Sequence, residues 1–223
     1  CLRGNDFGFA STGSAGASGS SLSTYSWNFG SGASPATSNA ASVSSVKYTT
    51  SGVKKIVLTI TDANGCTDTA EYNFNIKSQP QAVLSVSNAS QCLIGNSFTI
   101  GAAGSTAVTG STINTYFWTF GTNSSVTSAG PTSSSAANTI SYSDTGKKKV
   151  QLIVTDANGC KDTADTIAIV KQHPIAKWTV NSSFQCKVGQ SFNFASRQSK
   201  AAKGSSMSTY SWTFGSNGTP ASA

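Results

Sequence analysis

Five cysteines are the side chains whose type and spacing point most directly to chemistry. Cys1, Cys92 and Cys186 each begin a similar segment of nine residues. Cys66 and Cys160 each end the same sequence, Thr-Asp-Ala-Asn-Gly-Cys. Cysteines fixed at repeated positions are candidates for disulfides if the chain is exported.

Few other side chains of the sequence are candidates for catalysis. The 223 residues include one histidine, His173, which precedes Pro174 in an expected linker, and eight acidic residues scattered along the chain. Paired carboxylates and metal ligands therefore have few candidates. We expect a protein that is not an enzyme and that has no catalytic residue, no metal site and no cofactor.

The composition argues against both a helical and a disordered chain. Only 10% of the residues are charged, and Glu71 is the single glutamate, so common helix formers are scarce. Four Trp, six Tyr and eleven Phe supply the apolar area that a disordered segment lacks, and the net charge is a modest +7. No run of eighteen apolar residues occurs, so we expect no membrane span.

Internal repeats divide the sequence into units of about ninety residues. The expected domains are residues 1–77, which lack a first strand, residues 78–171, which are complete, and residues 172–223, the N-terminal part of a third. We therefore expect either an excerpt of a longer array or strands supplied by another chain. A Tyr-x-Trp-x-Phe-Gly signature marks each unit, and its expected core residues are Trp27, Phe29, Trp118, Phe120, Trp212 and Phe214.

Alternating apolar residues predict strands throughout each unit. Val150, Leu152 and Val154 are spaced by two, so their side chains share one face of a strand. Asn64-Gly65 and Asn158-Gly159 each lie between two such strands and predict hairpins with type I′ turns. Short strands separated by frequent turns predict an all-β, immunoglobulin-like sandwich with the signature tryptophan in its core.

The signature, a following Tyr and Gly turn, an alternating strand and Asp-Ala-Asn-Gly together resemble the PKD (polycystic kidney disease) domain. The companion cysteines resemble the version found in giant surface proteins of Bacteroidetes-type bacteria. The chain departs from the family pattern because no acidic residue follows Gly30, Gly121 or Gly215. The resemblance implies an extracellular spacer or adhesion module in tandem PKD-type sandwiches.

This sandwich topology bears on how the cysteines pair. Pairs within units would join Cys1 to Cys66 and Cys92 to Cys160, but the intervening strand spans roughly 25–30 Å. A disulfide needs Cα atoms within about 7 Å. We therefore favour an inter-domain Cys1–Cys160 bond, with Cys66, Cys92 and Cys186 pairing outside this sequence. Pairs within units and free thiols remain the alternatives.

Three further features have modest interpretations. The lysines at 54–55 and 147–149 are expected to be exposed residues that protect sheet edges, in preference to a nucleic-acid patch. Trp178 is expected in the core, in preference to a sugar-stacking role. Short Asp-Thr-aliphatic sequences resemble an O-glycosylation signal of the same bacterial group, with Thr69, Thr163 and Thr166 as candidate acceptors.

The sequence predicts a non-catalytic structural or adhesive repeat region of an extracellular bacterial surface protein or filament, stiffened by disulfides. Expected partners are neighbouring domains or copies of the array, with surface polysaccharide or a host surface as a further target. We expect no nucleic acid. One alternative is an accessory module that positions a secreted polysaccharide or protein hydrolase on its substrate, and another is polymerisation by strand exchange.

Overall fold

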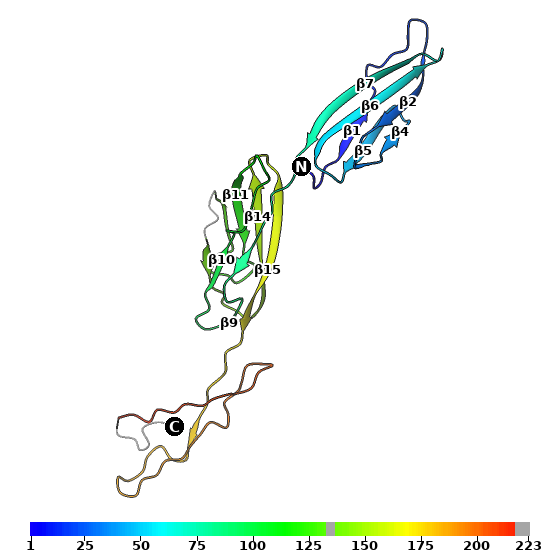
Figure 1. Cartoon of the computed structure of the whole chain (residues 1–223). Coiled ribbons are helices and arrows are strands. Elements are labelled where there is room, and N and C mark those ends of the chain that lie inside the picture. The colour runs from blue at the N-terminus through cyan, green and yellow to red at the C-terminus, as the bar shows by residue number, and fades with distance from the viewer. Residues whose placement is uncertain (133–136, 217–223) are drawn as a thin grey trace.

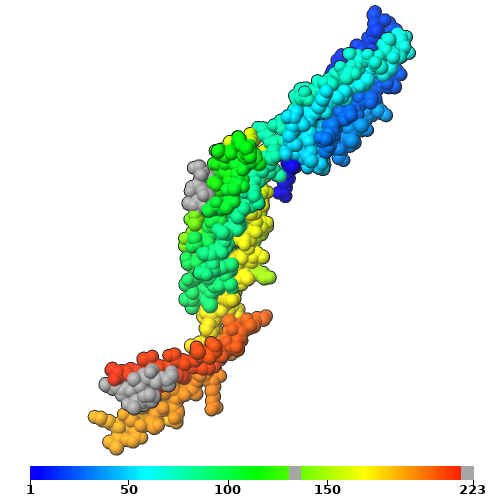
Figure 2. All heavy atoms as spheres, viewed as in Figure 1, coloured from blue at the N-terminus to red at the C-terminus, as the bar shows by residue number. Residues whose placement is uncertain are grey.

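The computed structural model describes residues 1–132 and 137–216, with the backbone alone at Pro131 and Thr132. Three units follow one another along the chain and lie end to end (Figures 1 and 2). Within the described segments the regular elements are all strands. No helix there has the length and apolar character needed to cross a bilayer.

The first unit is a sandwich of two antiparallel sheets. One sheet has the order β4 (Thr37–Ser38), β2 (Leu22–Asn28), β6 (Gly52–Asp62) and β7 (Thr67–Ile76). The other has the order β1 (Phe7–Ala10), β5 (Ser42–Tyr48) and β3 (Ala33–Ser34). The core between them includes Trp27, Phe29 and Val46, since inward and outward side chains alternate along each strand.

The second unit repeats this architecture with more strands. Its larger sheet has the order β12 (Ser128–Thr132), β11 (Ile113–Thr119), β14 (Gly146–Asp156), β15 (Lys161–Lys171) and β9 (Ser90–Cys92). Its smaller sheet has the order β13 (Asn138–Ile140), β10 (Phe98–Gly101) and β8 (Ser85–Val86). β9 pairs in parallel with the last residues of β15, which places Cys92 opposite Lys171.

The packing of the second unit follows the predicted alternation. Val150, Leu152 and Val154 on β14 are fully buried, together with Trp118 and Phe120. Each buried aliphatic side chain contributes about 1.5–3 kcal/mol to stability. The prediction of an all-β fold made of tandem immunoglobulin-like sandwiches is confirmed.

The third unit is described only in part. Its strands are β16 (Thr179–Val180) and β17 (Phe194–Ala195), which pair antiparallel. Trp212 and Phe214 are half-buried there. The expectation that Trp178 lies in the core is wrong, because its side chain is 61% exposed. The described residues of this unit include no strands matching β14 and β15 to cover it.

Candidate functional site: the junction between the first two units

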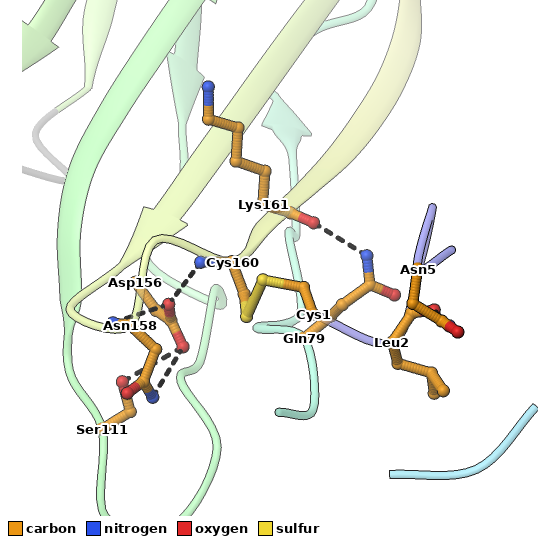
Figure 3. Close-up of a disulfide and its surroundings, with 9 residues drawn as sticks. All are labelled: Cys1, Leu2, Asn5, Gln79, Ser111, Asp156, Asn158, Cys160 and Lys161. Atoms are coloured by element: carbon orange, nitrogen blue, oxygen red, sulfur yellow. Dashed lines mark hydrogen bonds between the residues drawn. A yellow bond between two sulfur atoms is a disulfide. The ribbon is translucent and has the colours of Figure 1, made fainter. Parts of the chain in front are cut away.

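A disulfide crosses the junction between the first and second units. Cys1 is bonded to Cys160, with Cα atoms 5.4 Å apart and a sequence separation of 159 (Figure 3). Cys1 is exposed, whereas Cys160 is fully buried. Because the two cysteines belong to different sandwiches, the bond links two separately packed cores.

The hairpin between β14 and β15 holds Cys160 in place. The Asp156 carboxylate accepts hydrogen bonds from the backbone N–H groups of Asn158, at 3.0 Å, and Cys160, at 2.8 Å. Its second oxygen accepts a hydrogen bond from the Ser111 hydroxyl at 3.1 Å (Figure 3). A carboxylate bonded to its own turn is the usual role of aspartate in such sequences. Asp156 therefore fixes the backbone that carries the cysteine.

The hairpin turn differs from the type I′ turn that the sequence suggested. The N–H of Asp156 donates to the Cys160 carbonyl, which closes a loop of three residues rather than two. Gly159 has a φ of 78°, while Asn158 keeps a negative φ. A three-residue loop with glycine in the left-handed region is the next common hairpin class. The prediction of the hairpin position is correct, and its turn type is wrong because the side chain of Asp156 caps a longer loop.

The first unit carries the same hairpin at the end that lies away from this junction. The Asp62 carboxylate accepts hydrogen bonds from the N–H groups of Asn64 and Cys66, both at 2.9 Å, and Gly65 has a φ of 83°. The bond from Cys66 is the main reason that the pKa of Asp62 is lowered from its ordinary value. Cys66 is exposed and has no disulfide partner within the described residues.

An asparagine that the sequence analysis missed fixes the loop that follows Cys1. The Asn5 amide donates to the carbonyls of Leu2 and Tyr48 and accepts a hydrogen bond from the Tyr48 N–H at 2.6 Å. The Leu2 N–H donates to the Lys77 carbonyl at 2.8 Å. The loop is thus tied to β5 and to the start of the linker, so Cys1 is presented at the junction.

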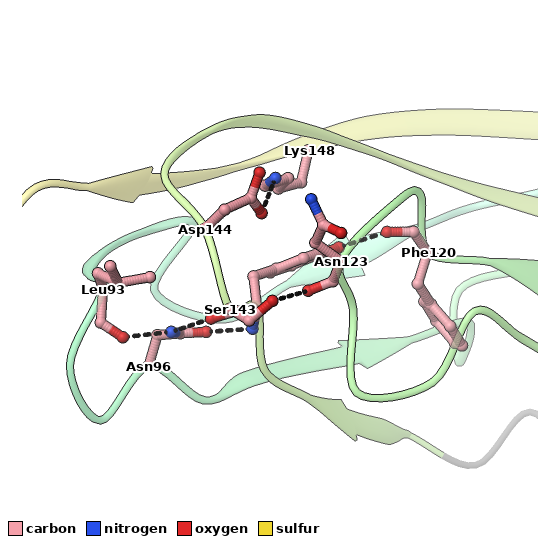
Figure 4. A network of polar contacts seen from close by, with 8 residues as sticks. Leu93, Asn96, Phe120, Asn123, Ser143, Asp144 and Lys148 are labelled. Atoms are coloured by element: carbon pink, nitrogen blue, oxygen red, sulfur yellow. Dashed lines mark hydrogen bonds and ion pairs between the residues drawn. The ribbon is translucent and has the colours of Figure 1, made fainter.

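Asn96 makes the same contacts in the second unit (Figure 4). Its amide donates to the carbonyls of Leu93, at 2.6 Å, and Tyr142, at 2.8 Å, and it accepts from the Tyr142 N–H at 2.7 Å. The signal in the sequence was the repeated pattern Cys-Leu-x-Gly-Asn. The third unit has Gln190 at this position.

A buried tyrosine lies beside each asparagine. The Tyr142 hydroxyl donates to the Phe120 carbonyl at 2.7 Å, and the corresponding Tyr48 hydroxyl donates to the Phe29 carbonyl at 2.8 Å. Burial raises the pKa of Tyr142 to about 12. Burial also raises the pKa of Tyr48. Each hydroxyl therefore stays protonated and ties the end of the signature strand to the segment that carries the tyrosine.

Two lysines contradict the expectation of exposed edge residues. Lys54 and Lys148 are buried, and each ammonium lies 5.5 Å from a tyrosine ring centroid, consistent with a cation–π contact. Lys148 also contacts Asp144, and this hydrogen bond is the main reason that the pKa of Asp144 is lowered (Figure 4). The prediction was wrong for these two lysines because the tyrosine ring and nearby oxygens compensate for burial of the charge.

Polar contacts also fix the linker that joins the two units. The Gln79 side chain donates to the Lys161 carbonyl at 3.0 Å, and the Ala82 N–H donates to the Asp162 carboxylate at 2.9 Å (Figure 3 shows the first of these). The Asp162 carboxylate also lies 4.0 Å from the guanidinium of Arg3 in the first unit. The sequence drew attention to Asp162 only as part of a candidate O-glycosylation signal, and it did not predict these contacts, because single polar side chains carry no pattern.

The other cysteines lie away from this junction. Cys66, Cys92 and Cys186 are exposed and have no disulfide partner among the described residues. Cys92 lies opposite Lys171, at the end of β15 farthest from Cys160. Because eleven strand residues span about 35 Å, a Cys92–Cys160 bond within the unit is incompatible with this structure.

The threonines of the Asp-Thr-aliphatic sequences differ in accessibility. Thr69 on β7 and Thr163 on β15 are exposed, whereas Thr166 on β15 is half-buried, on the same face as Ala168. Two of the three candidate residues are therefore exposed, and the Thr69 hydroxyl lies 3.4 Å from the Thr59 hydroxyl.

These features together define a class: tandem immunoglobulin-like β-sandwich modules linked covalently at a junction. The family profile described as the PKD domain matches residues 3–76 and 78–170. The chain therefore belongs to the PKD domain family, and the resemblance inferred from the sequence is confirmed. Domains of this family are typically non-catalytic structural or adhesive modules.

Other comparisons add distant similarities only. Solved fibronectin(III)-like modules of Clostridium thermocellum CbhA are 11% identical with a TM-score of 0.33, covering 74% of this chain and 95% of that one. Murine CEACAM1b is 12% identical with a TM-score of 0.27, covering 68% and 86%. These values support no functional argument. None of the curated proteins matches the chain.

Proposed function

We propose that this chain is part of an extracellular stalk in a bacterial surface adhesin or filament, in which disulfides between consecutive PKD domains limit bending. The Cys1–Cys160 bond carries the proposal, because it joins the facing ends of two domains whose cores are complete without it. Disulfides persist in oxidising compartments, which supports a secreted location at the cell surface.

The remaining cysteines support the same arrangement. Cys92 occupies the position of Cys1 in its repeat, and Cys66 occupies the position of Cys160. All are exposed, as a bond to a neighbouring domain or to another copy requires. The partners of the stalk are therefore domains of its own kind, and surface polysaccharide or a host surface is the target of the whole assembly.

The experiment compares the chain with a Cys1→Ser/Cys160→Ser variant by small-angle X-ray scattering and thermal unfolding. We expect the variant to sample a wider range of overall dimensions, while the unfolding temperatures of the two domains change by less than about 5 °C. The Cys66→Ser variant changes the equivalent hairpin away from the junction and serves as the matched control. Identical scattering of the double variant and the control would contradict the proposal.

A further inference from the structure

We infer that Asp162 positions Cys1 against Cys160 before the disulfide forms, and thereby favours formation of this bond. The inference rests on the proposed function, since a stalk stiffened at its junctions requires the correct cysteines to meet. Asp162 is suited to this role because it lies at the base of the Cys160 hairpin and contacts both the linker and the first domain.

The contact with the linker places the linker along the start of β15. One carboxylate oxygen of Asp162 accepts the Ala82 N–H at 2.9 Å. The neighbouring Lys161 carbonyl accepts the Gln79 side-chain amide at 3.0 Å. Pro80, between these two points, has a fixed φ and no N–H. The path of the linker is therefore restricted without any contribution from the sulfur atoms.

The contact with the first domain involves the other oxygen of the same carboxylate. The other oxygen of Asp162 lies 4.0 Å from the Arg3 guanidinium, and the side chains are 27% and 72% exposed. Arg3 follows Cys1 by two residues, and Leu2 between them is tied to the Lys77 carbonyl. An attraction that draws Arg3 to Asp162 therefore draws Cys1 toward the hairpin. The contact involves no sulfur atom, so we expect the reduced protein to make it as well.

The equivalent residues elsewhere in the chain lack this combination. Asp68 occupies the position of Asp162 in the first unit, but its carboxylate accepts the N–H of its own neighbour Thr69, at 2.8 Å. Ile94 occupies the position of Arg3 in the second unit and is 72% exposed. The arrangement is thus a property of this junction and not of the repeat, which provides a matched control in Asp68.

The bond forms by exchange with a small-molecule disulfide such as oxidised glutathione. Two S–H bonds of Cys1 and Cys160 break and one S–S bond forms, while the two electrons and two protons convert the small disulfide into two thiols. The equilibrium constant of this exchange reports the effective concentration of one cysteine near the other. Contacts that hold the two thiols together raise that concentration, whatever the stiffness of the oxidised junction.

The test uses the full chain with Cys66, Cys92 and Cys186 replaced by serine, so that one pair remains. The protein is equilibrated in glutathione buffers, its free thiols are alkylated, and the oxidised fraction is measured by mass spectrometry. We expect Asp162→Asn to lower the effective concentration by about five- to tenfold. We expect Asp68→Asn to change it by less than about twofold.

An unchanged value for Asp162→Asn, or an equal fall for Asp68→Asn, would overturn the inference. If Asp162→Asn unfolds the second domain, Arg3→Gln decides instead, because this exposed side chain supports no core. The expected fall is about twofold, with recovery in Arg3→Lys, and no fall would overturn the inference. A junction that oxidises normally but scatters identically with and without its disulfide would instead refute the proposed function alone.

Discussion

The two junctions of the chain begin at equivalent points of the repeat but are held by different contacts. At the first, the Cys1–Cys160 disulfide and the Asp162 carboxylate connect consecutive units. At the second, the described contacts of the linker are a bond between Gln172 and the Lys203 N–H at 3.4 Å and a local bond at His173. Among the described residues, the linker of the second junction therefore has fewer polar contacts than the linker of the first.

The first junction shows what each of its two domains contributes. The loop that presents the cysteine is built alike on both sides, since the Leu2 and Leu93 N–H groups donate to the Lys77 and Lys171 carbonyls, each at 2.8 Å. The hairpin that carries Cys160 approaches the first junction from the following unit. At the first junction, the preceding domain thus offers a preformed loop that carries Cys1, and the following domain supplies the hairpin that carries Cys160.

The largest expected effect comes from removing the side chain that holds the corresponding loop of the second unit in place. Asn96→Ala leaves the buried N–H and carbonyl of Tyr142 without partners, which costs about 3 kcal/mol. We expect the unfolding temperature of the second domain to fall by about 10 °C or more in calorimetry. Gln190→Ala changes the exposed equivalent position of the third unit and should leave the unfolding temperature of the second domain unchanged. Equal stabilities of the two variants would refute this role of Asn96.

A smaller effect separates the two linkers directly. The Ala82 N–H is bonded to the Asp162 carboxylate, whereas the equivalent Ala176 N–H has no partner among the described residues. We expect the Ala82 amide to exchange its hydrogen at least about tenfold more slowly than the Ala176 amide, measured by NMR. Similar rates would mean that the first linker is no more restrained than the second.

The smallest expected effect concerns the hairpin of the first unit that carries Cys66, and it is measured as a change in stability with pH. Because the pKa of Asp62 lies below its ordinary value of 3.8, its ionised form stabilises the fold above about pH 4. This stabilisation is lost as the pH falls through the lowered pKa. We expect Asp62→Asn to reduce the acid sensitivity of the first domain in thermal unfolding between pH 6 and pH 2.

Asp68→Asn is the control for this pH experiment, because it removes a carboxylate of the same strand pair that is not bonded to the turn. The same reduction in both variants would assign the acid sensitivity to net charge instead of to the turn.

Local patterns made the fold predictable from the sequence. Val150, Leu152 and Val154 occupy alternate positions of one strand, so their burial could be predicted from local spacing alone. Asn96 was missed because its partner Tyr142 is 46 positions away. Lys148 was misjudged for a different reason: its partners Tyr142 and Asp144 are close in the sequence, but their compensation for a buried charge is not visible in strand alternation. Polar groups buried through non-local contacts leave little periodic signal.

The position of the Cys1–Cys160 bond also determines how the molecule would carry a stretching force. A pull applied at Cys1 and at a point beyond Lys171 passes through the sulfur atoms and then along β15. The intervening loop, with a sequence separation of 159, is bypassed and bears no tension. Unravelled, that loop would add roughly 500 Å of length, which becomes available only when the bond is reduced. Reduction of this disulfide would thus allow the connection between these two points to lengthen under force.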